Sequence, residues 1–139
     1  MNGKSNGKTF VWPIRVYYED SDAQGVVYYA NYFRFMERAR TEWIRSLGIE
    51  QDVLMYRERR IFVVVDTEAQ FVSPARFNDQ LAVTAELLEL SGASFQVGQD
   101  IFRNNTDGEL LCRGTIRAAY LNADTLKPAR LPESLFKDF

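Results

Sequence analysis

The chain has 139 residues, of which 46% are hydrophobic and 26% charged, and its net charge is -2. These values suit one domain with a hydrophobic core, and they exclude a disordered chain and a bulk electrostatic attraction to nucleic acid. The sequence contains no histidine and one cysteine, Cys112. Serine–histidine and cysteine–histidine catalysis, histidine metal sites and internal disulfides are therefore excluded, and no metal or cofactor is expected.

The N-terminal segment, residues 1–8, is polar and glycine-rich, and we expect it to be flexible. It lacks the apolar run of a signal peptide, and no run in the chain approaches the roughly 18 apolar residues that cross a bilayer. With the single cysteine, these features favour a cytoplasmic location. Residues 10–18 are rich in β-forming side chains and predict a first strand.

The clearest predicted element is an amphipathic helix that follows the loop of residues 19–29. Asn31 is the predicted N-cap of this helix, and Gly48 is predicted to end it. The loop therefore leads directly to the positive end of a helix dipole. The apolar residues recur at the spacing of one helical face: they are Tyr32, Phe35, Met36, Ala39, Trp43 and Leu47.

Four more strands are predicted, over residues 61–71, 80–90, 94–103 and 109–120. Ser91-Gly92 and residues 104–108 indicate hairpins, the second with positive φ in Asp107-Gly108. Hairpins produce an antiparallel sheet, and one apolar helix covers one of its faces. The predicted fold class is therefore α+β: a single hot-dog domain, in which a curved antiparallel five-stranded sheet wraps a long helix.

The strand over 61–71 begins with apolar residues on both faces. Such a strand needs cover on both sides. This favours a homodimer with a continuous sheet, or a homotetramer made of two such dimers, with each active site between subunits.

Residues 18–32, with the sequence YEDSDAQGVVYYANY, carry three carboxylates within four positions just before the helix. One interpretation is a solvated acidic turn, because aspartate is common in turns. The other is catalytic. A carboxylate beside a helix N-terminus can act as a base or a nucleophile on an electrophile whose oxygen lies near free backbone N–H groups. Gly25 permits a close approach of the backbone to a substrate.

Residues 12–32, together with ERARTE at 37–42, resemble the YbgC-type acyl-CoA thioesterases encoded with the Tol-Pal system. These enzymes belong to the 4-hydroxybenzoyl-CoA thioesterase branch of the hot-dog fold. The resemblance includes residues 73–76 and 126–128, so residues 9–139 are expected to form a hot-dog thioesterase domain. It implies hydrolysis of an acyl-CoA, or of an acyl-carrier-protein thioester, to a free acid and a thiol.

The resemblance also implies roles for individual residues. The family's catalytic aspartate precedes an x-x-Gly-Val step, which places this role on Asp22 and leaves open whether it attacks the thioester or activates a water. Glu19 and Asp20 lie outside the catalytic position, and we interpret them as structuring the loop. Backbone N–H groups near Ala30 to Phe33 are implied to polarise the carbonyl. The implied substrate-binding residues of the loop and helix start are Gly25, Val26, Ala30, Asn31 and Tyr32.

Tyr29 stands where YbgC-type enzymes usually carry histidine, whereas the 4-hydroxybenzoyl-CoA thioesterase pattern has tyrosine there. A phenol donates a hydrogen bond, but it ionises only around pH 10 and is a poor base at neutral pH. We therefore expect Tyr29 to position the carbonyl or a water. Ser94 and Arg113 are weaker candidates for contacts with CoA, Arg113 through a phosphate. The alternative for Ser94 is an ordinary strand start, and for Arg113 it is a solvated face of the sheet.

A second function is open at this point, because a fold does not determine a function. It is a non-catalytic hot-dog protein that binds acyl-CoA or an acyl carrier protein and acts through protein contacts. Asp22 and Gly25 favour the hydrolase, and Tyr29 favours the binding protein.

Overall fold

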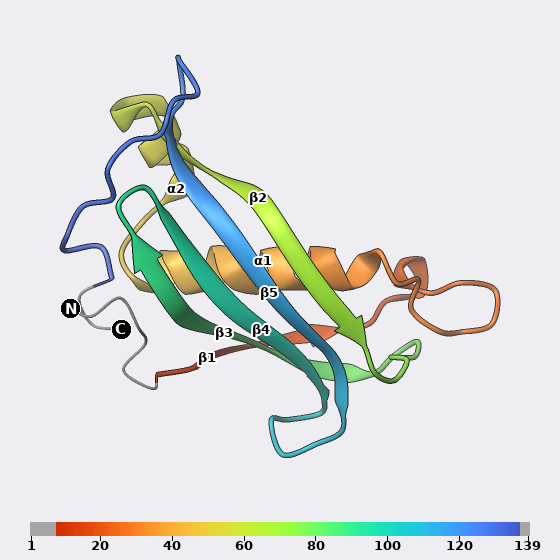
Figure 1. Cartoon of the computed structure of the whole chain (residues 1–139). Helices are drawn as coiled ribbons and strands as arrows, with labels where there is room; N and C mark the ends of the chain where they lie inside the picture. Colours follow the sequence, from red (N-terminus) through yellow and green to blue (C-terminus); the bar gives the residue numbers. More distant parts are fainter. Residues whose placement is uncertain (1–7, 137–139) are drawn as a thin grey trace.

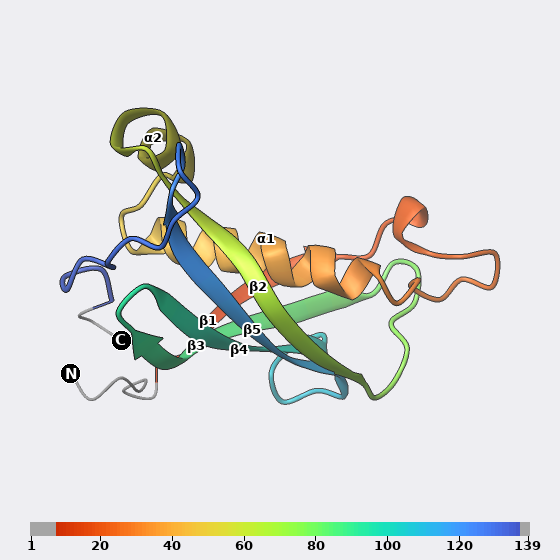
Figure 2. The ribbon, with the colours of Figure 1, turned by 45° about the horizontal axis from the view of Figure 1, so that its top comes forward.

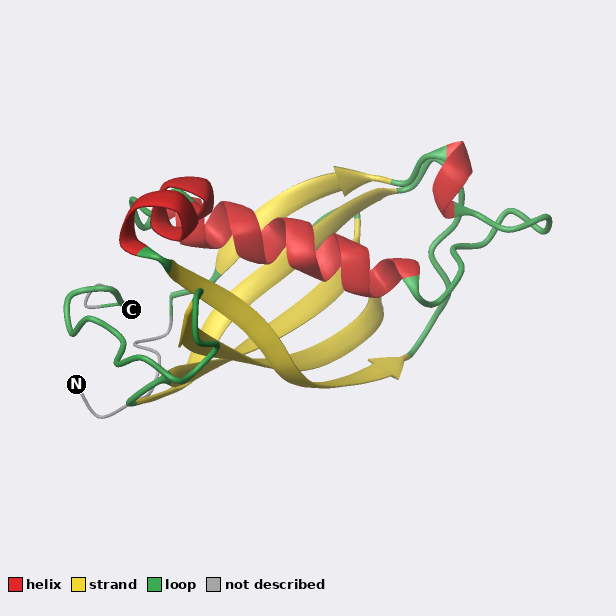
Figure 3. Cartoon of the chain, turned by 90° about the horizontal axis from the view of Figure 1, so that it is seen from above, coloured by secondary structure: helices red, strands yellow, loops and turns green. Residues whose placement is uncertain are grey.

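In the computed structural model, which describes residues 8–136, one long helix lies along a curved five-stranded antiparallel sheet (Figure 1, Figure 3). The strand order is β1-β3-β4-β5-β2, so β1 and β2 are the two edges. The predicted hot-dog arrangement and α+β class are confirmed. The bounds are β1 Phe10–Arg15, α1 Asn31–Ser46, α2 Gln51–Val53, β2 Arg60–Phe71, β3 Gln80–Ser91, β4 Ser94–Arg103 and β5 Leu110–Asn122.

The segment predicted to be flexible, residues 1–8, lies outside the described residues except for Lys8. Within residues 8–136, every helix is too short or too polar to reach across a bilayer.

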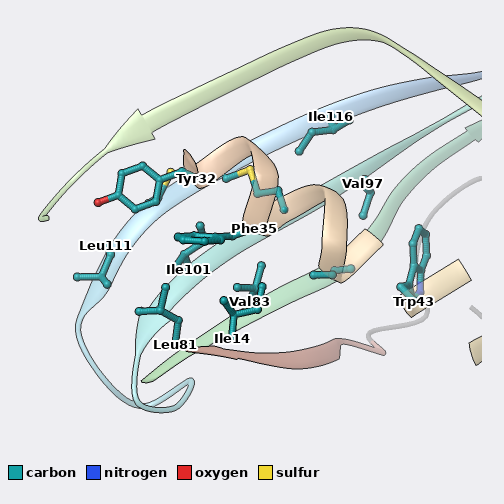
Figure 4. Packing of buried hydrophobic residues seen from close by; sticks show 14 of the residues in the cluster. Ile14, Tyr32, Phe35, Trp43, Leu81, Val83, Val97, Ile101, Leu111 and Ile116 are labelled. Carbon is teal, nitrogen blue, oxygen red and sulfur yellow. The ribbon is translucent and has the colours of Figure 1, made fainter. Parts of the chain in front are cut away.

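Helix α1 is held in place by its apolar stripe. The side chains of Phe35, Met36, Ala39 and Trp43 are completely buried. All four belong to one core cluster with residues of the sheet, and Figure 4 shows Phe35 and Trp43 within it. A helix of this length is only marginally stable alone, whereas each fully buried large side chain contributes about 1.5–3 kcal/mol. Packing on the sheet, rather than intrinsic propensity, therefore stabilises α1.

The two ends of α1 differ in how well they were predicted. Gly48 has a φ of 90°, as expected for a glycine that ends a helix. The N-cap is Ala30, and Asn31 is already the first helical residue, so the prediction for Asn31 was wrong. Its side-chain Nδ2 instead donates a hydrogen bond to the backbone oxygen of Asp20, at 2.9 Å. Asn31 thus ties the helix start to the preceding loop.

The β4–β5 hairpin turns at residues 104–109, where a hairpin was predicted. The positive φ, however, belongs to Asn104 at 69°, and not to Asp107-Gly108. Gly108 is needed for a different reason. A Cβ at this position would lie 2.0 Å from the backbone oxygen of Arg103 and 3.0 Å from that of Asn105. Only glycine lets the chain pass so close to these carbonyls.

Gly108→Ala is expected to lower the free energy of unfolding by about 1–3 kcal/mol, because the hairpin backbone must shift or stay strained. Gly92→Ala is the matched control. It lies in the β3–β4 hairpin, where a Cβ would meet nothing within 4 Å. Urea denaturation of both variants at one protein concentration measures the difference. Equal stability of the two variants would contradict the assigned role of Gly108.

Candidate active site

The β1–α1 loop, residues 16–30, projects beyond one end of the sheet, opposite the end that carries the β3–β4 hairpin (Figure 1, Figure 2). The buried carboxylate of Asp20 organises it. Its Oδ2 accepts the backbone N–H of Tyr17 at 2.8 Å, which ends β1 earlier than predicted and starts a turn over Tyr18–Asp20. The backbone oxygen of Asp20 accepts the N–H of Tyr28 at 3.3 Å. Asp20 therefore joins the two ends of the loop.

The structuring role predicted for Asp20 is thereby confirmed. Glu19 was expected to share it, but Glu19 is exposed, and its carboxylate makes no hydrogen bond or ion pair within residues 8–136. That part of the prediction was wrong, because the exposed carboxylate of Glu19 binds no group of the loop.

Asp22 lies on a tight turn in the exposed part of the loop. Its Oδ1 accepts the N–H of Gln24 at 2.8 Å and approaches that of Val26 at 3.4 Å. Its Oδ2 accepts no hydrogen bond from the described residues, so one oxygen fixes the side chain while the other is free. The turn favours glycine at position 25 because its φ is 78°, although a Cβ there would meet nothing within 4 Å. Gly25 thus acts through its backbone conformation.

The loop is also attached to the segment that follows β2. The N–H of Val27 donates to the oxygen of Ala75 at 2.8 Å, and the N–H of Phe77 donates to the oxygen of Gly25 at 2.9 Å. Val26 pairs with Arg76 in an isolated antiparallel bridge. These contacts hold Gly25 and Val26, two of the predicted substrate-binding residues, beside Asp22.

The free backbone donors at the start of α1 differ from the predicted ones. The N–H groups of Asn31, Tyr32 and Phe33 donate to the oxygens of residues 28, 29 and 30, at 2.9, 3.2 and 3.2 Å. The N–H groups of Tyr29 and Ala30 have no acceptor among the described residues. Because they lie at the positive end of the α1 dipole, they are suited to bind an oxyanion. Of the predicted donors only Ala30 remains, and Tyr29 joins it.

An aromatic cluster surrounds these donors. The ring of Tyr29 packs on Tyr28, with 4.8 Å between centroids, and on Phe71 at 5.7 Å. Phe71 also contacts Tyr32 and Phe33. A hydrogen bond with Tyr29 raises the pKa of Tyr28. Tyr29 thus packs on two aromatic neighbours and is itself 55% exposed.

The side chain of Tyr32, a predicted substrate-binding residue, is used by the fold. Its side chain is only 3% exposed, and its hydroxyl accepts the N–H of Ala75 at 2.9 Å. Burial raises its pKa, so the phenol stays neutral. Tyr32 belongs to the α1 stripe, and its polar end holds the chain that follows β2. Asn31, whose side chain binds Asp20, is likewise occupied within the fold.

Ser94 and Arg113 lie away from the β1–α1 loop within one chain. Ser94 begins β4 at the opposite end of the sheet, where its hydroxyl is 3.1 Å from that of Ser91 and accepts a hydrogen bond from Arg117 at 3.2 Å. Arg113 pairs with Asp100 at 3.3 Å on the sheet face remote from α1. The structure therefore does not bring these two residues to Asp22.

Asp22 and Tyr29 line separate hollows of the single chain. The hollow at Asp22, about 670 Å³, is lined by residues 17–19 and 21–23. The hollow at Tyr29, about 250 Å³, lies between the helix start and the end of β2, beside Phe71. The carboxylate and the phenol are thus neighbours on one loop but face different spaces.

The remaining groups to consider are the single cysteine and the side chains that could bind a metal. Cys112 is completely buried, as its alternation with apolar neighbours indicates, and burial raises its pKa to about 11. It is inert as a nucleophile at neutral pH. Within residues 8–136, no three metal-binding side chains lie together.

Comparison with known proteins decides the family. A family model described as the thioesterase-like superfamily matches residues 16–139. The chain belongs to this superfamily. One member, acyl-CoA thioester hydrolase YbgC of Escherichia coli O157:H7, is 40% identical over 134 residues, which cover 96% of this chain and 98% of that protein. Acyl-CoA thioesterase YbgC of Haemophilus influenzae is 37% identical, over 91% of this chain and 90% of its own length.

Solved structures of thioesterases agree with this family. A probable thioesterase from Bartonella henselae has a TM-score of 0.83 and 33% identity, over 90% of this chain and 100% of that one. The 4-hydroxybenzoyl-CoA thioesterase of a Pseudomonas strain has a TM-score of 0.84 at 20% identity, over 94% and 99%, which shows the common fold. The family predicted from residues 12–42 is thereby confirmed.

Two parts of the site were missed from the sequence. The free N–H group of Tyr29 has no sequence signal, because it depends on which carbonyls the first helical turn reaches. For Phe71 the sequence does carry a signal, because the alternation of side chains along β2 places it opposite the buried Cys112, on the face toward α1. An apolar residue at the end of that strand face had to lie near the helix start.

Proposed function

We propose that Asp22 and the free N–H groups of Tyr29 and Ala30 form the centre with which this chain, an acyl-CoA thioester hydrolase, cleaves its substrate. The observation that carries the proposal is the placement of two unused donors at the positive end of α1, after a turn that holds a carboxylate with one free oxygen. The donors suit the oxygen of a thioester carbonyl, and the carboxylate suits attack at its carbon.

Two routes use these groups. In one, Asp22 takes a proton from a water that attacks the carbonyl carbon; in the other, its carboxylate attacks and forms a mixed anhydride that water then opens. In both, the carbonyl oxygen becomes an oxyanion that the two N–H groups stabilise. The carbon–sulfur bond breaks, and the sulfur leaves as a thiolate that takes up a proton. The products are a free acid and a thiol.

The proposal includes a second copy of the chain. Strand β2 is an unpaired edge, and Val64, Val65 and Phe71 on it are 45%, 56% and 47% exposed. Pairing of two β2 edges would cover these side chains and give a continuous sheet, with each active site between subunits. Such a homodimer, alone or doubled into a homotetramer, also offers the route by which Ser94 or Arg113 of another copy reaches the substrate.

The substrate is an acyl group on CoA, or on an acyl carrier protein, which presents the same kind of thioester. An enzyme that hydrolyses acyl-CoA must share a compartment with CoA, so the proposal includes a cytoplasmic location. The test is release of free thiol by the wild-type protein from a panel of short, medium, long and aromatic acyl-CoAs. Turnover of at least one is expected. Binding of acyl-CoA without turnover of any would identify a binding protein and overturn the proposal.

We propose that the phenol of Tyr29 positions the carbonyl or a water, so Tyr29→Phe, which removes this hydrogen-bond donor, is expected to lower kcat by about three- to tenfold. Tyr28→Phe, which removes the neighbouring exposed phenol, is the control and should change kcat less. Tyr29→His should add a limb around pH 6.5 to the pH profile of kcat, which the wild type lacks. Unchanged kinetics in the Tyr29→Phe variant would remove the phenol from the mechanism.

A further inference from the structure

A groove of about 440 Å³ runs between α1 and the β2 edge, away from Asp22. Its walls include the apolar side chains of Phe33, Val64 and Ile116. Arg40 differs from these apolar residues because it brings a positive charge into the groove. It also lines the next hollow along the helix. Arg40 is half-buried, whereas the other two arginines of the groove, at positions 34 and 38, are exposed at its rim.

A buried glutamine holds this guanidinium in place. Nη1 of Arg40 donates to Oε1 of Gln99 at 2.9 Å. Gln99 is completely buried, and its Nε2 donates to the backbone oxygens of Met36 and Thr84, at 2.9 and 3.2 Å. Because Nε2 is fixed by two acceptors, Oε1 has to face Arg40. The sequence signal is a polar residue on the inward side of β4, between Val97 and Ile101.

The positive charge of Arg40 is only partly balanced by the fold. Gln99 is neutral, and no carboxylate within residues 8–136 forms an ion pair with Arg40. Glu37, one turn earlier on α1, lines the same groove and favours the charged form of Arg40 from a distance, while its carboxylate accepts a hydrogen bond from Thr41 at 3.1 Å. Burial lowers the pKa of Arg40, although an arginine stays charged at any working pH. Holding an unpaired cation in an apolar groove costs free energy that an anionic ligand recovers.

We propose that Arg40 binds a carboxylate at the far end of the acyl group, so that the enzyme favours thioesters of dicarboxylic acids. This rests on the proposed function, in which the thioester carbonyl lies at the start of α1. Arg40 follows Asn31 by nine positions, which corresponds to about 14 Å along the helix axis. Its guanidinium lies nearer the helix start, because the Gln99 amide that holds it also binds the backbone oxygen of Met36, only five positions after Asn31. The apolar walls suit the methylene chain between the two ends. Nε and Nη2 of Arg40 remain as donors for a planar carboxylate.

The test compares kcat/KM for adipoyl-CoA with that for adipoyl-CoA whose distal carboxylate is a methyl ester, and with that for hexanoyl-CoA. The wild type should favour the free carboxylate by about 10- to 100-fold, the range of a charge-assisted hydrogen bond. Arg40→Met should remove most of this preference, and Arg40→Lys should keep part of it. Arg57→Met, which removes an equal charge from an exposed position outside the groove, should leave the preference intact.

Three results would overturn this assignment and leave the proposed function standing. One is wild-type turnover of hexanoyl-CoA or the methyl ester as fast as that of adipoyl-CoA. Another is a preference that survives in Arg40→Met. The third is an Arg40→Met variant that loses inhibition by free CoA as strongly as it loses adipoyl-CoA turnover, because Arg40 would then bind a CoA phosphate. Failure of all thioesters to react would instead contradict the proposed function itself.

Discussion

Replacing Asp22 by asparagine is expected to lower kcat for thiol release by about 10³-fold. General acid–base catalysis contributes on the order of 10²- to 10⁴-fold, and an amide can neither accept a proton from water nor attack a carbonyl. The variant should keep its fold, because Oδ1 is the atom that holds the turn, and an asparagine can offer the same oxygen to Gln24 and Val26. The loss should therefore fall on kcat rather than on stability.

Glu19→Gln is the matched control for Asp22→Asn. It removes the same charge from the same loop, three positions away, from an exposed carboxylate that makes no hydrogen bond or ion pair within residues 8–136. Its kcat should stay within about twofold of the wild type, as expected for a surface substitution. An Asp22→Asn variant that matches the Glu19→Gln variant would show that the loop acts only as a solvated acidic turn.

Trp43→Ala is expected to lower the free energy of unfolding by about 3–5 kcal/mol, the usual cost of removing a large buried aromatic side chain. The indole of Trp43 is completely buried near the C-terminal end of α1. It stacks on Phe136, with 5.4 Å between centroids, and meets the edge of Phe95 at 5.8 Å. Its loss opens a cavity and releases the segment after β5, which closes this end of the core.

Urea denaturation at one protein concentration measures this loss, since association of copies would otherwise shift the apparent stability. Tyr56→Ala is the control, because the side chain of Tyr56 is 72% exposed. Its effect should stay within about 0.5 kcal/mol. A Trp43→Ala variant that loses less than about 1 kcal/mol would contradict the packing described for this end of the core.

The order of helices and strands was predictable because the spacing of apolar residues and the positions of turn-forming residues indicate the same elements along this chain. The helical spacing from Tyr32 to Trp43 and the alternation in the three C-terminal strands are strong local signals. Hairpin signals at Ser91-Gly92 and at residues 104–108 then fixed an antiparallel sheet. The position of Asp22 followed from the family resemblance, whereas its free oxygen and the bond from Oδ1 to Gln24 did not.

The rest of the site depends on groups that meet only in the folded chain. Asn31 reads as an N-cap, but the carbonyl of Asp20 lies close enough to take its amide. Tyr32 reads as part of the site, yet the same residue completes the apolar stripe and is buried. The pairing of Arg40 with Gln99 joins residues 59 positions apart. No local pattern connects two such residues, so a single sequence could not predict their contact.

The most direct test of the proposed centre is a crystal structure with a non-hydrolysable acyl-CoA analogue, in which a ketone replaces the thioester. The ketone oxygen is expected within about 2.7–3.1 Å of the backbone nitrogen of Tyr29 or Ala30, with the free oxygen of Asp22 facing the ketone carbon. A ketone bound away from the start of α1, with Asp22 still turned to solvent, would contradict the account.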